Sequence, residues 1–235
     1  MRAMTQTTEA RLKYYSVITG FFCAVLLLTN AVSAKLIDIG PLTVVGGTLL
    51  FPIAFIFNDI LTEVYGFRLT RKVIWTGLGC QLLAIAVYAV IGAIPPAAGW
   101  PHQDAFTQIL GSLPRITFAS VVAYFCGEFA NSVVLSRMKY AEHGARGWRE
   151  GWRFVASTIV GEGVDSVVFM TVAFLGVLSS AVIVHGIVSI YILKVAYEIV
   201  ATPVSTRVAN WLKTQEGVDV IDEPTTNYSP FAVNQ

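Results

Sequence analysis

Six apolar stretches constrain the fold of this chain more than any other feature. A helix needs about 20 apolar residues to cross a bilayer, and the sequence offers six stretches of about that length. They cover residues 14–34, 42–65, 73–94, 116–136, 154–176 and 181–206. Charged residues make up only 13% of the chain, whereas a soluble domain carries about 25%. The sequence therefore predicts an all-α integral membrane protein, built as a six-transmembrane-helix bundle.

The basic residues gather on one side of the predicted bundle. Of the 16 Lys and Arg residues, 13 precede the first span, follow the last one, or lie in the second and fourth connections. Because basic residues favour the cytoplasmic side, we predict cytoplasmic N- and C-termini. Residues 1–13 form the predicted N-terminal segment, 14–213 the transmembrane domain and 214–235 a disordered cytoplasmic tail. The Pro-rich connection 95–114 is predicted to be an irregular outer cap.

Composition and motifs exclude several classes of function. The net charge of +1 gives no basic excess for binding nucleic acid. Neither a phosphate-binding GxxxxGK[ST] loop nor an HExxH zinc motif occurs, and we predict no cofactor, no metal site and no catalytic residue. The three cysteines lie in apolar runs, which indicates small buried side chains, and His102, His143 and His185 are interpreted as surface residues. The expected partners are membrane lipids and a small molecule; whether the chain forms a homodimer stays open.

Seven ionisable side chains fall inside the predicted spans. They are Asp59, Glu63, Glu128, Glu162, Asp165, Lys194 and Glu198. Charges in a bilayer are costly and by default face a bundle interior or an aqueous cavity. Four of the acids, Asp59, Glu128, Glu162 and Glu198, each lie nine residues from the first arginine at the cytoplasmic edge of the same helix. At 1.5 Å per residue that is roughly 13 Å, so the spacing predicts one layer of carboxylates near mid-membrane.

Polar neighbours share a helix face with these acids. Asn131 and Asp165 lie three residues after Glu128 and Glu162, and Tyr197 lies three residues after Lys194. The sequence GEFANSVV at 127–134 also recurs as GEGVDSVV at 161–168. The two helices concerned run in opposite directions, which is typical of an inverted pair facing a common midplane site.

So many buried acids cannot all stay ionised without partners, because burial disfavours the charged form. Either some are protonated, or they bind a ligand rich in N–H donors, since a carboxylate accepts two parallel hydrogen bonds. A neutral or cationic flat heterocycle fits this requirement, and an anionic ligand does not. Aromatic residues in the same spans could stack on such a ring, although each of them is more often a packing residue.

Several of these fragments together resemble the bacterial queuosine precursor transporter family, also called vitamin uptake transporters. The fragments are Phe51-Pro52, the run NDILTEVYG at 58–66, the two Gly-Glu-x-x-[Asn/Asp]-Ser segments, Lys194-x-x-Tyr197-Glu198 with Pro203, and Asn30 followed by Lys35. The resemblance extends from about residue 14 to residue 213. It implies uptake of a 7-deazaguanine, preQ0 or preQ1, across the bacterial inner membrane by a protein without its own ATPase.

The resemblance also implies roles for individual residues. Substrate contact is expected for Glu128, Asn131, Glu162, Asp165, Lys194, Tyr197, Glu198 and Asn30. A gate or a proton pathway is expected for Asp59 and Glu63. The competing interpretations are structural: hydrogen bonds between helices for the Gly-Glu segments, salt bridges from Asp59 and Glu63 to Arg68, Arg71 or Lys72, and an internal pair between Lys194 and Glu198.

Other functions stay open at this point. The chain could be the substrate-capture subunit of a larger importer whose ATPase is a separate protein, or a proton- or cation-coupled carrier of another small heterocycle. A membrane-embedded enzyme is a third alternative, because paired carboxylates serve as acid and base in catalysis. No activated nucleophile is visible in the sequence, which weighs against that alternative.

Overall fold

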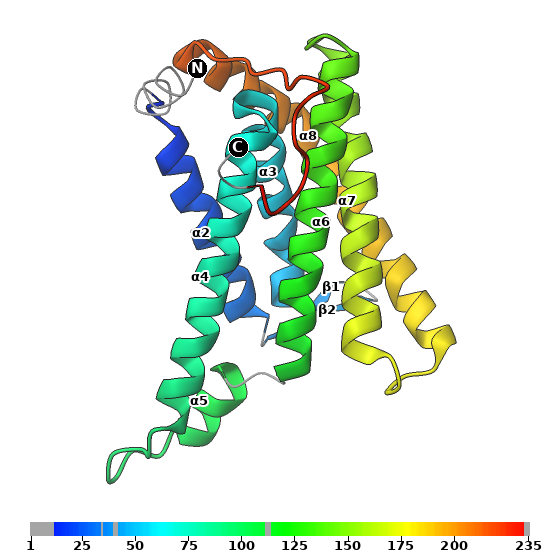
Figure 1. Cartoon of the computed structure of the whole chain (residues 1–235). Coiled ribbons are helices and arrows are strands. Elements are labelled where there is room, and N and C mark those ends of the chain that lie inside the picture. Colours follow the sequence, from blue (N-terminus) through cyan, green and yellow to red (C-terminus); the bar gives the residue numbers. More distant parts are fainter. Residues whose placement is uncertain (1–11, 34, 40–41, 111–113, 233–235) are drawn as a thin grey trace.

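The chain forms a bundle of long helices (Figure 1) in a computed structural model that describes residues 12–33, 35–39, 42–110 and 114–232. Six helices in this part of the chain are long and apolar enough to cross a membrane. The six spans are formed by α2 (Tyr15–Val32), α3 (Phe51–Tyr65), α4 (Phe67–Ala93), α6 (Pro114–Ala141), α7 (Trp148–Phe174) and α8 (Ser180–Glu216). The six-helix prediction is confirmed, with ends that differ from the expected ones.

Two segments depart from the expected helices. The strands β1 (Leu36–Ile39) and β2 (Leu42–Val45) form an antiparallel hairpin before the 3-10 turn η1 (Gly46–Leu49), so the start of the second predicted span is extended rather than helical. Residues 42–45 include Thr43, Val44 and Val45, whose β-branched side chains favour strands, and α3 begins afterwards with Pro52 in its first turn. The predicted irregular cap also contains a short helix, α5 (Gln103–Leu110).

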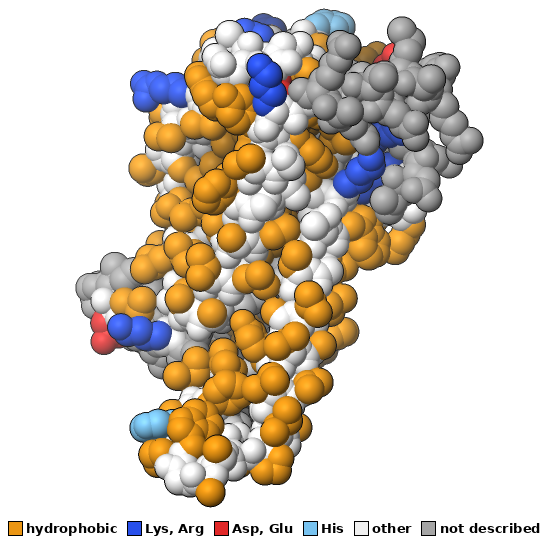
Figure 2. Space-filling model, turned by 90° about the vertical axis from the view of Figure 1, so that its left-hand side faces the viewer, with side chains coloured by type: hydrophobic (Ala, Val, Ile, Leu, Met, Phe, Trp, Pro, Cys, Tyr) orange, Lys and Arg blue, Asp and Glu red, His pale blue; other side chains and the backbone are white. Residues whose placement is uncertain are grey.

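Helix α3 lies at the centre of the bundle. Every residue from Asn58 to Tyr65 is buried, and the helix packs against α2, α4, α6 and α8. The outer helices instead expose large apolar side chains, and Figure 2 shows hydrophobic side chains over most of one face, with several Lys and Arg side chains near its upper end. Because exposed apolar surface of this extent suits lipid rather than water, the fold is that of a multi-pass membrane protein.

The start of α2 and the end of α8 meet at one end of the bundle (Figure 1). The Glu216 carboxylate, at the end of α8, accepts hydrogen bonds from the backbone N–H groups of Lys13 and Tyr14, at 2.9 and 2.7 Å, just before α2. It also accepts one from the Tyr65 hydroxyl at the end of α3 (2.9 Å). This arrangement agrees with an even number of spans. We refer to it as the terminal end of the bundle.

The chain after α8 differs from its predicted disorder. Residues 217–232, which we name the C-terminal strap, return along the bundle and contact α3, α4 and α6. Asp222 accepts a hydrogen bond from the Phe67 backbone N–H at the start of α4 (2.8 Å) and one from the Ser136 hydroxyl of α6 (2.6 Å). Arg71 of α4 donates to two strap carbonyls. The strap is polar, as the sequence shows, but several of its acceptor groups receive hydrogen bonds from donors on the helices.

Candidate functional site

Four helices form a closed ring around the buried ionisable residues. Helix α3 packs against α6 and α8, and α7 packs against the same two helices. Helices α6 and α8 therefore stand opposite each other, as do α3 and α7. The ring holds all seven ionisable residues that the sequence places inside the spans, and each of them is buried.

The two repeated Gly-Glu segments bring α6 and α7 together in a reciprocal way. A Cβ atom added to Gly127 would lie 2.9 Å from the Cβ of Asp165, and one added to Gly161 would lie 2.7 Å from the Cβ of Asn131. Because Asp165 is the repeat counterpart of Asn131, as Gly161 is of Gly127, the contact has local two-fold symmetry. The interpretation of these segments as an inverted pair is thus supported by their packing, and the glycines are required for the close approach.

Hydrogen bonds between α3 and α6 satisfy the acid Asp59. The Asn131 side-chain amide donates to Asp59 Oδ1 at 2.6 Å. From α7, Ser157 and Thr158 approach the same carboxylate at 3.5 Å. One residue earlier on α3, the Asn58 amide donates to the backbone carbonyl of Glu128 (3.2 Å). Asp59 is therefore part of a bonded network between helices.

Lys194 is bonded to α7 and not to its neighbour on α8. Its ammonium group lies 2.6 Å from Asp165 Oδ2 and 2.8 Å from Glu162 Oε2. The same nitrogen lies 3.9 Å from the centre of the Phe51 ring, which is a cation–π distance. The expected alternative of a pair between Lys194 and Glu198 is replaced by a salt bridge between adjacent helices, which we name the Lys194 triad (Glu162, Asp165 and Lys194).

The carboxylates of Glu128 and Glu198 are buried and have no hydrogen-bond partner in the part of the chain that the structure describes. Their residues are 0% and 1% exposed, and among the described residues none donates a hydrogen bond to any of their four carboxylate oxygens. Glu128 lies within electrostatic range of Glu162, Asp165, Lys194 and Glu198. Because an unpaired buried carboxylate is costly, these two side chains are the strongest indication of a ligand site in the bundle.

Two of the predicted substrate residues lie elsewhere. Tyr197 is 40% exposed on α8, so its side chain faces outwards while Lys194 and Glu198 face the ring. Asn30 of α2 lies against Gln81 of α4, with its amide 3.4 Å from the Gln81 side-chain oxygen. The structure brings together the other six predicted substrate residues, Glu128, Asn131, Glu162, Asp165, Lys194 and Glu198.

Glu63 belongs to a second polar layer, one helical turn from Asp59 toward the terminal end. Its Oε1 atom lies 2.8 Å from Arg153 of α7 and 2.6 Å from Lys213 of α8. Lys139 of α6 lies 3.8 Å from the same oxygen. The competing interpretation for Glu63 is a salt bridge to Arg68, Arg71 or Lys72, which lie close in sequence; Glu63 does form salt bridges, but with cations from three other helices. We name this layer the Glu63 network.

The C-terminal strap adds an acid to the Glu63 network. Asp219 lies 2.5 Å from Lys139, 3.3 Å from Arg146 and 3.4 Å from Lys213. Partial burial by itself would raise the pKa of Asp219, but the hydrogen bond and charge of Lys139, together with Lys213 and Arg146, lower this pKa below its ordinary value of 3.8. Asp219 therefore carries its negative charge at neutral pH and holds the strap to α6 and α8.

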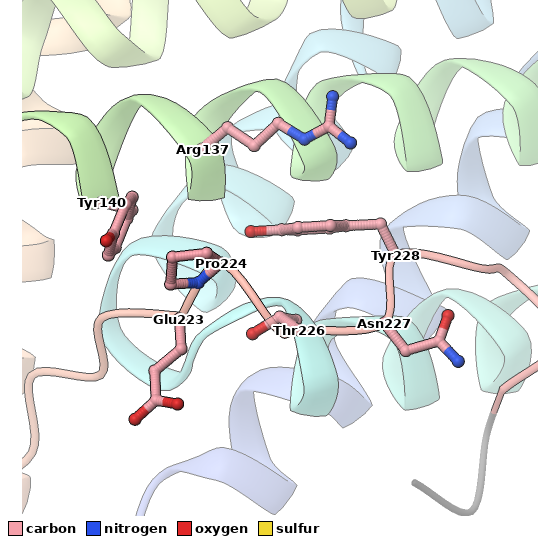
Figure 3. A pocket seen from close by; sticks show the side chains of 7 residues that line it. All are labelled: Arg137, Tyr140, Glu223, Pro224, Thr226, Asn227 and Tyr228. Atoms are coloured by element: carbon pink, nitrogen blue, oxygen red, sulfur yellow. The ribbon is translucent and has the colours of Figure 1, made fainter.

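A surface cavity of about 420 Å³ lies between the strap and α6, and Figure 3 shows its lining residues. They are Arg137, Tyr140, Glu223, Pro224, Thr226, Asn227 and Tyr228. The Arg137 guanidinium lies 4.9 Å from the centre of the Tyr228 ring. Arg137 is nine residues along α6 from Glu128, or roughly 13 Å, so this cavity is separate from the mid-depth acids.

Several residues that complete the two layers are absent from the sequence prediction. Ser157 and Thr158 beside Asp59 carry no charge to mark them, and the sequence indicates Phe51 only as one of several aromatic residues that could stack on a ligand ring. A helical signal does exist for the first two, because Ser157, Thr158, Gly161 and Glu162 recur at three- and four-residue spacing on α7. Arg153 and Lys213 were counted only as basic residues at helix edges.

Comparison with known proteins gives several matches. A protein-family model described as "Putative vitamin uptake transporter" matches residues 45–208. The chain is 28% identical over 176 residues to the "Probable queuosine precursor transporter" of Bacillus subtilis, covering 74% of this chain and 75% of that protein. It is 26% identical over 128 residues to the "Queuosine precursor transporter" of Escherichia coli, covering 54% of each.

A third relative, the "Probable queuosine precursor transporter" of Haemophilus influenzae, is 27% identical over 132 residues, covering 54% of this chain and 51% of that protein. The matches to the last two relatives thus span about half of their length. No solved structure matches this chain. All three relatives are named as transporters, which supports a transport role over an enzymatic one.

Proposed function

The chain belongs to the vitamin uptake transporter family, and we propose that it imports a queuosine precursor across the inner membrane of a bacterium. The observation that carries this proposal is the family match together with the names of three relatives from three bacteria. The proposed substrate is a 7-deazaguanine such as preQ0 or preQ1. The termini are proposed to lie in the cytoplasm.

The chemistry of the mid-depth layer supports this substrate class. A 7-deazaguanine carries several N–H donors on a flat ring, and the layer offers an excess of carboxylate acceptors around one lysine. Buried acceptors that await donors discriminate strongly against ligands lacking those donors. We propose that the Phe51 ring, which lies next to Lys194, stacks on the flat ring of the substrate.

The Glu63 network supports a gate between this layer and the terminal end of the bundle. Its ion pairs join α3, α6, α7 and α8, the same helices that carry the mid-depth acids. Passage of a ligand toward that end requires these helices to separate, as in alternating access. We therefore propose that Glu63 acts in the gate, and that Asp59 links the gate to the ligand layer.

Uptake into proteoliposomes tests the proposal. The purified full chain, reconstituted alone, is expected to accumulate radiolabelled preQ1, and an excess of unlabelled preQ0 should compete while biotin and thiamine should not. Liposomes prepared without protein are the control. If labelled biotin or thiamine is taken up and preQ1 is not, the proposed substrate class is wrong.

Binding distinguishes this role from that of a capture subunit. A melting-temperature shift with preQ0, preQ1, queuine and guanine measures binding without transport, because a ligand at a hundred times its dissociation constant adds about 2.7 kcal/mol to stability. Tight binding without uptake by the isolated chain would favour a capture subunit that needs a separate ATPase.

A further inference from the structure

We propose that Glu128 and Glu198 contact opposite edges of the ligand ring, while the Lys194 triad remains bonded to itself. This inference rests on the proposed function and divides its binding site into two parts. One part is a pair of buried acceptors on two helices that stand opposite each other. The other is a salt bridge that neutralises two acids and joins α7 to α8.

The shortest polar bonds of the layer join adjacent helices of the ring, whereas the two longer bonds from Ser157 and Thr158 of α7 cross it to Asp59 of α3. Asn131 to Asp59 joins α6 to α3, and Lys194 to Asp165 joins α8 to α7. Glu128 and Glu198 belong to α6 and α8, which stand opposite each other across the ring. A ligand located between them would have one carboxylate at each edge.

The charge of Lys194 is already paired within the bundle. An ammonium group has three N–H donors, and its nitrogen contacts Asp165, Glu162 and the face of the Phe51 ring. The positive charge of Lys194 is therefore paired with the carboxylates of Asp165 and Glu162. Glu162 Oε2 also accepts no hydrogen bond, but it lies 2.8 Å from the Lys194 nitrogen; within the described chain, Glu128 and Glu198 have neither a hydrogen-bond donor nor a salt-bridge cation at their carboxylates.

The required ligand must offer donors on two different edges. In 7-deazaguanine, the ring N1–H and the 2-amino group form a parallel pair of donors on one edge, and the pyrrole N–H lies on another edge. A carboxylate accepts the parallel pair with two hydrogen bonds, and the second carboxylate accepts the remaining N–H. Two acidic residues on opposite helices thus match the donor pattern of one ring.

Binding of three probes to the full chain and its variants tests this arrangement. The probes are 7-deazaguanine, its analogue without the 2-amino group, and its analogue methylated on the pyrrole nitrogen. Isothermal titration of E128Q and E198Q in detergent should show a loss of roughly 10- to 100-fold in affinity for 7-deazaguanine, because hydrogen bonds to charged groups are worth roughly 1.5–3 kcal/mol.

The analogues show which carboxylate contacts which edge. Loss of the 2-amino group should weaken binding to the wild type and to one variant, but have little further effect on the other variant. Methylation of the pyrrole nitrogen should also weaken binding to the wild type, but it should affect the variant that tolerates loss of the amino group and have little further effect on the other one. The matched control is E150Q, because Glu150 is equally buried but bonds Lys213 and Asn210 toward the terminal end of the bundle; its affinity for 7-deazaguanine should stay at the wild-type value.

The outcomes separate this inference from the proposed function. If the wild type binds 7-deazaguanine and both E128Q and E198Q bind it equally well while melting cooperatively, the inference is overturned and the proposed function stands. The same holds if each analogue loses as much affinity in both variants as in the wild type. If the folded wild type binds no deazaguanine, the proposed function and the inference are both overturned.

Discussion

No group among residues 12–33, 35–39, 42–110 and 114–232 donates a hydrogen bond to the carboxylates of Glu128 and Glu198, and the burial of these carboxylates costs free energy. An unsatisfied buried polar group costs roughly 1–3 kcal/mol, and more when it is charged. We therefore predict that E128Q and E198Q raise the melting temperature of the ligand-free protein. About 2–4 °C is expected for each kcal/mol gained in a chain of this size, measured by thermal unfolding in detergent.

The opposite change is predicted for Lys194. The variant K194M leaves Asp165 and Glu162 as unpaired buried acids, and breaking a buried ion pair costs about 3–5 kcal/mol. Its melting temperature should fall well below that of the wild type in the same detergent. An unchanged melting temperature would mean that the Lys194 triad is absent from the protein in solution.

The contrast among these residues shows what sequence could predict at this scale. The depth count, which depends only on helical rise, placed four of the acids at one level, and the structure brings these four into the same ring of helices. It could not choose partners. Glu63 bonds Arg153 and Lys213, which are 90 and 150 residues away, and not the nearby cations. Tyr197 faces outwards although it follows Lys194 by three residues. The buried face of α8 is too narrow to include both positions.

At the scale of elements, the close contact between α6 and α7 depends on two glycines. We predict that G127A and G161A each lower the melting temperature, because the added methyl group meets atoms 2.7–3.1 Å away on the facing helix; overpacking of this kind typically costs about 1–3 kcal/mol. The matched control is G163A on α7, whose Cβ would lie 3.7 Å from Tyr191, and its stability should stay near that of the wild type. Equal losses in all three variants would contradict the proposed packing.

The C-terminal strap gives a pH-dependent prediction. Because the pKa of Asp219 is lowered in the folded state, its ion pairs stabilise the protein fully above its ordinary value of 3.8 and progressively less as the pH falls below that. Wild type should therefore melt at a higher temperature than D219N at pH 7, and the difference should shrink below pH 4. A difference that is absent at pH 7, or unchanged at pH 3, would show that Asp219 does not hold the strap.

Sequence predicted the helices better than the segments between them. Length and apolar character suffice for a spanning helix, so all six were found. The β1–β2 hairpin and α5 lie where the local signal is weak, and the strap was missed because its polar composition indicates disorder unless donors elsewhere are known. Asp222 packs against the helices because the Phe67 N–H and the Ser136 hydroxyl donate hydrogen bonds to it. Amino-acid composition does not predict pairings between residues so far apart in sequence.

At the scale of the whole molecule, the distribution of basic residues predicts the orientation in the membrane. Most Lys and Arg residues lie toward the terminal end of the bundle, and basic residues favour the cytoplasmic side. We predict that green fluorescent protein fused after Gln235 fluoresces in cells, and that alkaline phosphatase inserted at Gly99 is active. The reverse pattern would place the termini outside the cytoplasm.

The reciprocal contact between Gly127 and Gly161 also has a mechanical meaning. It lies near the midpoints of α6 and α7, two long antiparallel helices, at the place where the two glycines allow their backbones to approach closely. A rigid rod that turns about its midpoint moves its two ends in opposite directions. A small rotation of α7 against α6 about this pivot would widen the bundle at one membrane surface while narrowing it at the other, so that a single motion both opens one entrance and shuts the other.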